Sequence, residues 1–154
     1  MRAAVCTAYG PPGVVRVRDV DMPAIGDHDV LIRIAAASVS AADWRLRARA
    51  MPRGFGLISR LAIGLQRPRR AILGCEFSGT VAAIGKSVTR FKVGEEVAGF
   101  PGVGLGCHAQ YRAMPDNGAL VAKPACLSHI EAAALFFGGT TALHFLRRKG
   151  RVRD

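Results

Sequence analysis

Short apolar segments separated by turns rich in glycine and proline recur along this sequence, and they restrict its fold more than any other feature. Residues 14–20 (VVRVRDV) show the clearest pattern, because apolar and charged side chains alternate there with the period of a half-buried β-strand. About seven such segments follow one another at close spacing. They span residues 2–8, 14–20, 30–39, 72–84, 91–97, 107–114 and 120–123. This spacing is typical of a small β-barrel or β-sandwich.

Three of the connections carry specific signals. Gly10-Pro11-Pro12-Gly13 is strong turn chemistry, so we expect residues 2–8 and 14–20 to pair as a hairpin. Residues 40–49 are rich in alanine and arginine and predict a short helix. Residues 50–70 predict a long loop, with one amphipathic turn around residues 57–63.

The C-terminal part of the sequence has helical signals instead. Ser128 can cap a helix, and Glu131 three residues later completes a capping box. We expect Gly138-Gly139 to interrupt this helix and a second helix to run over residues 140–149. Basic residues fill the last turn of that second helix, which suits its dipole.

The formal net charge of +11 is unevenly distributed. Arginines gather between Asp43 and Glu76, where no acidic residue occurs, and again within residues 147–153. Such clusters can contact nucleic acid or anionic membrane, or face an acidic domain or a phosphorylated cofactor. No motif for binding RNA or DNA accompanies them, so a solvated basic surface is the simpler interpretation and we predict no nucleic-acid partner.

The four cysteines lie at positions 6, 75, 107 and 126, and no pair has C-x-x-C spacing. A structural zinc site is therefore not indicated. The sequence has no hydrophobic secretory core and no run of about 18 apolar residues. We predict a cytoplasmic protein with free thiols and no membrane partner.

Three motifs, in order, resemble those of medium-chain dehydrogenases/reductases. Residues 72–85 (ILGCEFSGTVAAIG) and 91–97 (FKVGEEV) resemble the family pattern ILGxExxGxVxxxG followed by FxxGDxV. Residues 36–44 (AASVSAADW) resemble AxSVNPxDW, and residues 131–143 resemble EAAAxxxxGLTAxxAL. The glycines of the first motif mark points where strands approach closely.

The resemblance implies a mainly β fold, a partly open GroES-like barrel with a few short helices and a C-terminal helical segment. Residues 1–127 would form the catalytic, substrate-side domain, and residues 128–154 a helical linker toward a Rossmann domain. No G-x-G-x-x-G fingerprint follows a strand in this sequence, and Gly102-Val103-Gly104-Leu105-Gly106 is better interpreted as a loop. We therefore expect a chain truncated before its nucleotide-binding domain.

The resemblance also implies a zinc-independent enzyme. Zinc-dependent relatives have a cysteine where this chain has Ser40 and a histidine where it has Cys75, and their proton-relay hydroxyl corresponds to Ala42. Their third zinc ligand would lie beyond Asp154. Catalytic zinc needs about three protein ligands, so we predict no metal-binding residues, although Cys75 with Glu76 could still contact a metal.

What remains resembles quinone-oxidoreductase chemistry, in which NADPH transfers hydride to a quinone, enone or carbonyl acceptor. Such an acceptor needs little acid catalysis, and the resemblance names no catalytic residue. It places Ser40 and Thr141 beside the nicotinamide. Asp43 and Trp44 would border the substrate cleft, Asp43 mainly as an acceptor that organises the loop. Trp44 either lines that cleft or packs, and the sequence favours neither.

Two other interpretations stay open: a non-catalytic barrel remnant that binds a partner, and a basic nucleic-acid-binding protein. The absence of a Rossmann half favours the remnant for these 154 residues, and the resemblance favours the oxidoreductase for the complete protein. Exposed apolar side chains of the C-terminal helices are expected to promote self-association or a homo-oligomer.

Overall fold

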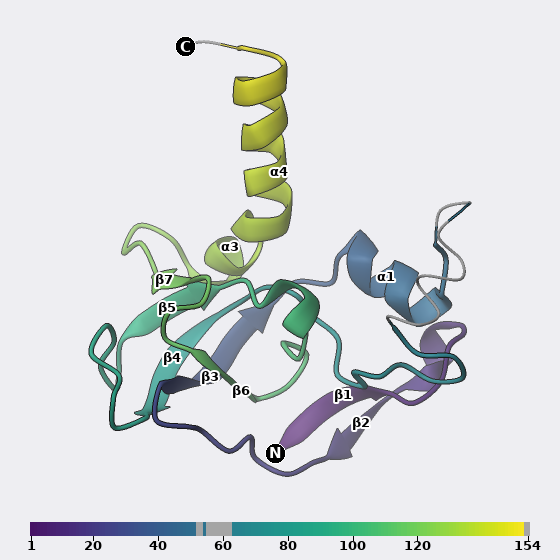
Figure 1. The fold of residues 1–154 in the computed structure, drawn as a ribbon, viewed down its shortest axis with the longest axis horizontal. Helices are drawn as coiled ribbons and strands as arrows, with labels where there is room; N and C mark the ends of the chain where they lie inside the picture. The colour runs from purple at the N-terminus through teal and green to yellow at the C-terminus, as the bar shows by residue number, and fades with distance from the viewer. Residues whose placement is uncertain (52–53, 55–62, 153–154) are drawn as a thin grey trace.

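Five antiparallel strands form one sheet that curves into a half-barrel, the body of the molecule (Figure 1). The structure is a computed structural model whose described residues are 1–51, 54 and 63–152. The sheet contains β3 (Asp29–Ala37), β4 (Phe77–Ile84), β5 (Glu96–Gly99), β6 (Tyr111–Pro115) and β7 (Leu120–Ala122). Their order is β6-β3-β4-β5-β7, so β6 and β7 form the two edges. The predicted fold class, a mainly β and partly open barrel, is confirmed.

The predicted N-terminal hairpin is also present. β1 (Arg2–Cys6) pairs antiparallel with β2 (Val15–Asp19), and a short 3-10 turn at Pro12–Val14 precedes β2. Single bridges from Ala3 to Ala109 and from Val5 to Ile72 attach this hairpin to the rest of the chain. The strand expected over residues 72–84 is shorter than predicted. It begins at residue 77, and Ile72 forms only the isolated bridge to Val5.

β3 and β4 approach each other closely at Gly79. A Cβ atom at this position would lie 2.2 Å from the carbonyl oxygen of Arg33 on the neighbouring strand, so only glycine fits without moving the backbone. The register of the β3–β4 pair shifts between Leu31 and Ile32 and again between Ile34 and Ala36. Such irregularities bend and twist a pair of strands, which curves the sheet.

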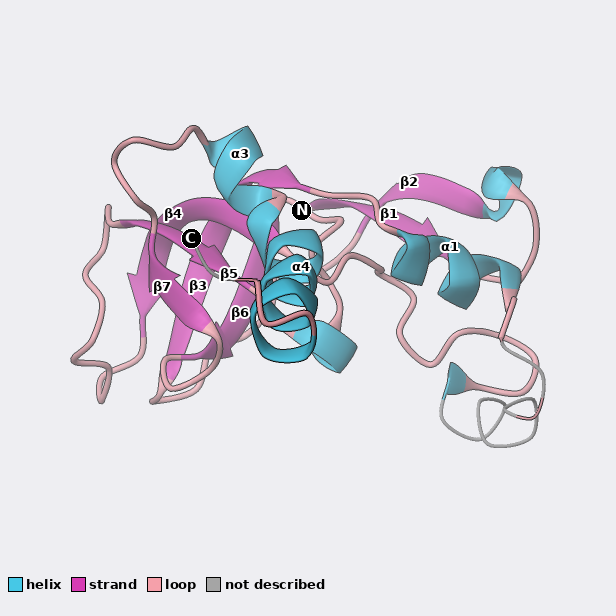
Figure 2. Ribbon diagram, turned by 90° about the horizontal axis from the view of Figure 1, so that it is seen from above, coloured by secondary structure: helices cyan, strands magenta, loops and turns pink. Residues whose placement is uncertain are grey.

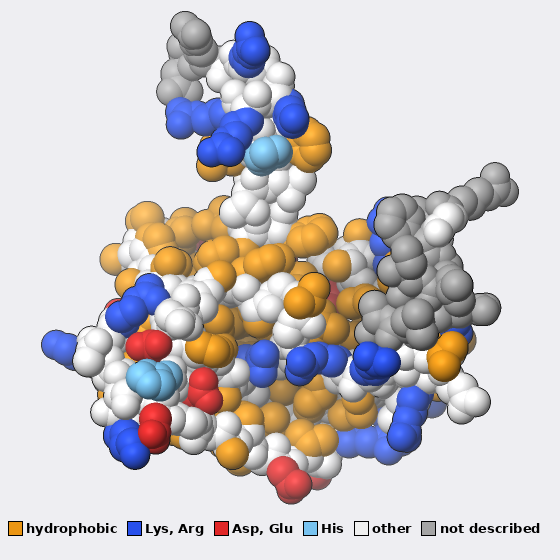
Figure 3. All heavy atoms as spheres, in the orientation of Figure 1, with side chains coloured by type: hydrophobic (Ala, Val, Ile, Leu, Met, Phe, Trp, Pro, Cys, Tyr) orange, Lys and Arg blue, Asp and Glu red, His pale blue; other side chains and the backbone are white. Residues whose placement is uncertain are grey.

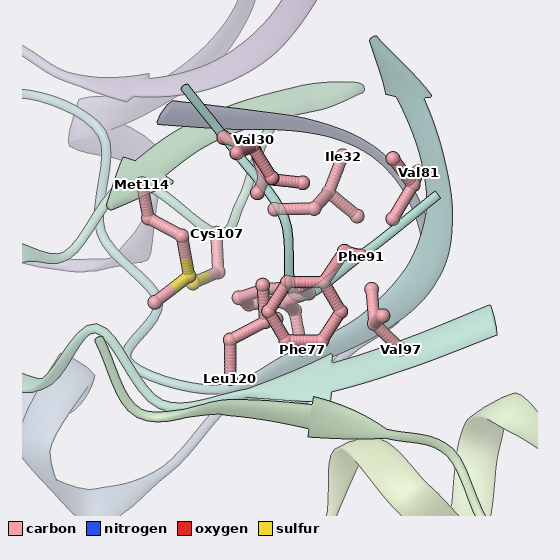
Figure 4. Packing of buried hydrophobic residues seen from close by; sticks show 10 residues of the cluster. Val30, Ile32, Phe77, Val81, Phe91, Val97, Cys107, Met114 and Leu120 are labelled. Atoms are coloured by element: carbon pink, nitrogen blue, oxygen red, sulfur yellow. The ribbon is translucent and has the colours of Figure 1, made fainter. Parts of the chain in front are cut away.

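The main core lies on the concave side of this sheet (Figure 4). Every strand of the sheet contributes, so the core joins segments that are far apart in the sequence. The fully or almost fully buried members are Val30, Ile32, Phe77, Val81, Phe91, Val97, Cys107, Met114 and Leu120. A smaller cluster of Cys6, Leu73, Cys75 and Leu105 lies under the hairpin and packs against Leu46.

Helices lie at two places around the sheet. α1 (Ala41–Ala48) follows β3, where the sequence predicts a helix. α3 (His129–Ala133) contacts β3, β4 and β5. A wider π-helical turn (Leu135–Gly139), α4 (Thr140–Leu143) and a second π-helical stretch (His144–Lys149) then form one continuous helix that rises from the sheet (Figure 1). Figure 2 shows α3 and α4 over the sheet and α1 beside the hairpin.

The expected interruption at Gly138-Gly139 is wrong. Helical backbone continues through both glycines, and Gly139 has φ −65° and ψ −45°. A glycine costs a helix only about 1 kcal/mol relative to alanine, so it weakens a helix without necessarily ending it. The helix direction changes instead near Ala134, the C-cap of α3, where φ is −88° and ψ is −4°.

Most of the long loop expected over residues 50–70 lies outside the described residues, including most of the amphipathic turn expected around residues 57–63. Gly102–Gly104 forms a short 3-10 turn inside a connecting loop, as expected for this glycine run. Along the described part of the chain, no helix has both the length and the apolar character needed to cross a bilayer.

Candidate functional site

Ser40 and Asp43 meet at the first turn of α1. The Ser40 hydroxyl accepts a hydrogen bond from the Ala42 amide at 3.2 Å and donates to Asp43 Oδ2 at 3.0 Å. The Ser40 amide donates to the same carboxylate oxygen at 2.8 Å, which completes a capping box. The other oxygen, Oδ1, accepts the Gly74 amide at 2.8 Å. Asp43 is thus the buried acceptor that fixes the end of β3, α1 and residue 74 together.

Cys75 lies on the other side of Ser40. Its Sγ is 3.8 Å from the Ser40 hydroxyl oxygen. Burial raises the pKa of the Cys75 thiol, and the hydrogen bond with Ser40 only partly opposes this. Burial likewise raises the pKa of Cys107 to about 12. Both side chains are therefore neutral thiols at physiological pH, which is the state of small apolar core residues.

Glu76 joins two separate parts of the chain, and sequence reasoning did not find this role. One carboxylate oxygen, Oε1, accepts the Ser38 hydroxyl, and Oε2 accepts the Phe137 amide at 2.8 Å. Glu76 is only 3% exposed. The carboxylate therefore connects the end of β3, two residues before Ser40, with the base of the C-terminal helix. Its place in the ILGCE motif is the only signal in the sequence.

Trp44 is half exposed, at 51% of its full surface. It lines a cavity of about 470 Å³ together with Asp43, Val39, Leu73 and His108. This volume is within the usual range for a small-molecule pocket. His108 is oriented here by a contact of 2.9 Å between its Nε2 and the Ser38 carbonyl oxygen. The structure thus places the two predicted cleft residues, Asp43 and Trp44, along one cavity.

Thr141 lies apart from the residues around Ser40 and Trp44. It lies on the helix that rises from the sheet (Figure 1), and its hydroxyl donates to the Phe137 carbonyl oxygen at 2.6 Å. Phe137 is the same residue whose amide is held by Glu76. The structure therefore connects the two predicted nicotinamide-side residues, Ser40 and Thr141, through Ser38, Glu76 and Phe137.

The donor set around Ser40 fits a metal ion poorly. Both oxygens of Asp43 and both oxygens of Glu76 accept hydrogen bonds, and the Cys75 thiol is neutral. Zinc requires deprotonated, converging ligands. Within residues 1–51, 54 and 63–152, no group of three or more His, Cys, Asp or Glu side chains is arranged to hold a metal.

The profile of alcohol dehydrogenase GroES-like domains matches residues 26–125, a range that contains β3 through β7. The chain belongs to this family. The GroES-like domain is 32% identical, over 146 residues, to quinone oxidoreductase of Pseudomonas aeruginosa. That match covers 95% of this chain and 40% of the relative, so the chain spans about two fifths of the relative's length. The resemblance inferred from the three motifs is confirmed.

Solved structures agree with this assignment. The GroES-like domain superposes on quinone oxidoreductase of Coxiella burnetii with a TM-score of 0.81 and 30% identity, covering 96% of this chain and 44% of the other. A mycobacterial protein solved in complex with NADPH has a TM-score of 0.77 and 26% identity, covering 100% of this chain and 43% of the other.

Proposed function

We propose that this GroES-like domain is the substrate side of a zinc-independent oxidoreductase that uses NAD(P)H to reduce a quinone, enone or carbonyl acceptor. The observation that carries the proposal is the Glu76 carboxylate, which joins Ser38, two residues before Ser40, to Phe137, whose carbonyl accepts the Thr141 hydroxyl. The similarity to quinone oxidoreductases and to a relative solved with NADPH supports it.

The two hydroxyls suit a nicotinamide carboxamide. A hydroxyl has one proton to donate and two lone pairs. Thr141 donates to the Phe137 carbonyl, so its accepting capacity is left. Ser40 donates to Asp43, accepts the Ala42 amide and lies 3.8 Å from Cys75 Sγ, so it has at most one lone pair left. An amide NH2 group needs acceptors, and these two hydroxyls can supply them. NADPH, when bound, supplies the hydride.

The remaining residues would position the acceptor. Trp44 offers an exposed aromatic face on the cavity that Asp43 borders. Burial raises the pKa of the neighbouring Cys75 thiol, which makes it a weak acid, and both oxygens of the Asp43 carboxylate already accept hydrogen bonds, so neither is a ready proton donor. A quinone or activated alkene tolerates such a site, because it accepts hydride with little acid catalysis.

A chimera tests this function. Residues 1–149 would be joined to the part of the P. aeruginosa quinone oxidoreductase that lies beyond the match, and NADPH oxidation would be followed with quinones and enones. We expect turnover by the chimera, and weak NADPH binding with no turnover by residues 1–154. Ser40→Ala should reduce the activity, whereas Thr89→Ala, at an exposed position beyond β4, should leave it unchanged.

A folded chimera that binds NADPH but reduces none of these acceptors would contradict the proposal and favour the non-catalytic binding module.

Metal analysis tests the zinc-independent part of the proposal. We expect less than stoichiometric zinc after dialysis, because the ligand set around Ser40 is incomplete. One tightly held zinc per chain, lost in Cys75→Ala, would refute the zinc-independent part of the proposal.

A further inference from the structure

The glycine run at residues 102–106 has no part in the proposed hydride transfer. Its glycines lie beside the side chain of Arg112. Arg112, on the edge strand β6, extends along this loop. A Cβ atom on Gly106, whose φ is +92°, would lie 3.3 Å from Arg112 Cδ and Nε. A Cβ atom on Gly104 would lie 3.2 Å from Arg112 Nη2. These two glycines leave room for the guanidinium group of Arg112.

The positive charge of Arg112 is poorly compensated. Its Nε is buried and has no hydrogen-bond partner among the described residues. Burial is the largest effect and lowers the pKa of Arg112, the neighbouring Cys107 sulfur acts in the opposite direction, and the positive charge of Arg70 lowers it further. The Asp29 carboxylate acts in the opposite direction, but it accepts the Gly26 amide at 2.8 Å. In the part of the chain that the structure describes, no carboxylate lies within salt-bridge distance of Arg112.

A partly apolar cavity of about 490 Å³ adjoins the same loop. Its apolar lining includes Leu46, Leu73, Val103 and Leu105, and Arg69 and Arg70 lie on it as well. Leu73 also lines the cavity beside Trp44, so the two cavities are neighbours. An apolar pocket bordered by guanidinium groups suits a ligand that has an apolar body and an anionic end.

We propose that Arg69 and Arg70, on the cavity wall, bind the anionic head group of a small amphipathic ligand whose apolar part occupies this cavity, and that Arg112, beside Gly104 and Gly106 of the adjoining loop, adds its unpaired positive charge. The head group is a carboxylate or a phosphate, since both accept paired hydrogen bonds from a guanidinium. A bound anion would offset the cost of burying an unpaired cation. This site goes beyond the proposed function, because binding here requires neither NADPH nor hydride transfer.

The test is a titration of residues 1–154 without cofactor, at constant ionic strength. The probes are octanoate, octyl phosphate and the neutral analogue 1-octanol, followed by calorimetry and by NMR shifts of the Leu73 and Leu105 methyl groups. We expect saturable one-to-one binding of at least one anionic probe, and binding of 1-octanol at least about tenfold weaker. The stronger of the two anions identifies the head group.

Variants separate this site from general attraction by a basic protein. Arg112→Gln should weaken binding of the anionic probe by about tenfold or more, and Arg70→Gln, at an exposed position, tests the same site without risk to the core. Arg18→Gln removes an exposed arginine on β2 and should leave binding unchanged. Absence of saturable binding, equal binding of 1-octanol, or equal losses in all three variants would overturn the proposal. Because no cofactor is present, these outcomes do not depend on the oxidoreductase proposal.

Discussion

The body of the half-barrel and the C-terminal helix differ in the solvent exposure of similar apolar side chains. In the body, Phe77 is 0% exposed and is surrounded by residues from every strand of the sheet. Along the helix, every residue from 137 to 152 is exposed, including Leu143, Phe145 and Leu146 at 57%, 60% and 56%. Figure 3 shows apolar side chains around the base of this helix and basic side chains toward its far end.

This difference shows where the chain supplies its own stability. The strands of the body bury each other, so their apolar side chains contribute to folding within these residues. The helix has little tertiary contact beyond its base, and short helices in proteins depend mainly on such packing. Substitutions in the body, in the helix and at their junction should therefore differ in their effect on the free energy of unfolding.

The largest contrast is expected between two phenylalanines. Phe77→Ala should lower the free energy of unfolding by about 3–5 kcal/mol, because it removes a ring from the centre of the core. Phe145→Ala should change it by less than about 0.5 kcal/mol, because that ring is already exposed to solvent. Urea denaturation of both variants measures the difference. Equal losses would mean that the helix packs on the body in solution.

Glu76 is the polar connection between the two regions, and its removal should have the next largest effect. Glu76→Ala leaves the partly buried Ser38 hydroxyl and Phe137 amide without their charged acceptor, which should cost about 1–3 kcal/mol. The Phe137 amide should then exchange with solvent faster. Glu76→Gln retains a carbonyl acceptor and should restore part of the protection, whereas Asp21→Ala, at an exposed position, serves as the control. Unchanged exchange at Phe137 in Glu76→Ala would contradict this connection.

Local patterns predicted much of the fold. Short apolar segments between turns indicated all seven strands, although β4, β5 and β6 begin four or five residues later than expected, and the turn residues at Gly10 to Gly13 located the first hairpin. The two capping boxes, Ser40 with Asp43 and Ser128 with Glu131, are present in the structure, and the second was predicted from spacing. These features succeed because each depends on residues that are close in sequence.

The rest of the site depends on contacts between distant residues, which spacing does not reveal. Ser38 and Glu76 are 38 positions apart, and Glu76 and Phe137 are 61 apart. The bend near Ala134 could not be predicted either, because the adjacent glycines gave a stronger local signal than the packing of α3 on the sheet. The glycine run at residues 102–106 indicated a loop, but nothing in its sequence showed that Arg112 would lie beside it.

Exposed apolar side chains on the helix should make the chain self-associate, with a smaller effect than the two changes above. Sedimentation over a range of concentrations should show reversible association of residues 1–154. Leu143→Glu should shift the population toward monomer without changing the unfolding midpoint of the monomer, because Leu143 is 57% exposed. Thr89→Glu, on the exposed loop after β4, should leave association unchanged. A monomer at all concentrations would refute this prediction.

The smallest effect concerns the start of α3, which leads from the body to the helix. The Ser128 amide and hydroxyl donate to Glu131 Oε2 at 2.9 and 2.8 Å, and these hydrogen bonds hold the pKa of Glu131 below its ordinary value. A carboxyl whose pKa is lowered by folding stabilises the native state above its unfolded pKa. That contribution is lost as the pH falls through the lower, folded pKa.

Acidification from pH 7 toward pH 3 should therefore loosen the first turn of α3 before the sheet unfolds, and hydrogen exchange of the Glu131 and Ala132 amides over this range measures it. Glu131→Gln should remove most of this pH dependence, because the amide does not titrate there. Ser128→Ala should destabilise the helix by about 1 kcal/mol at neutral pH, because it removes the N-cap hydroxyl. If wild-type exchange at these amides were independent of pH after correction for intrinsic rates, the capping box would contribute nothing to the junction between body and helix.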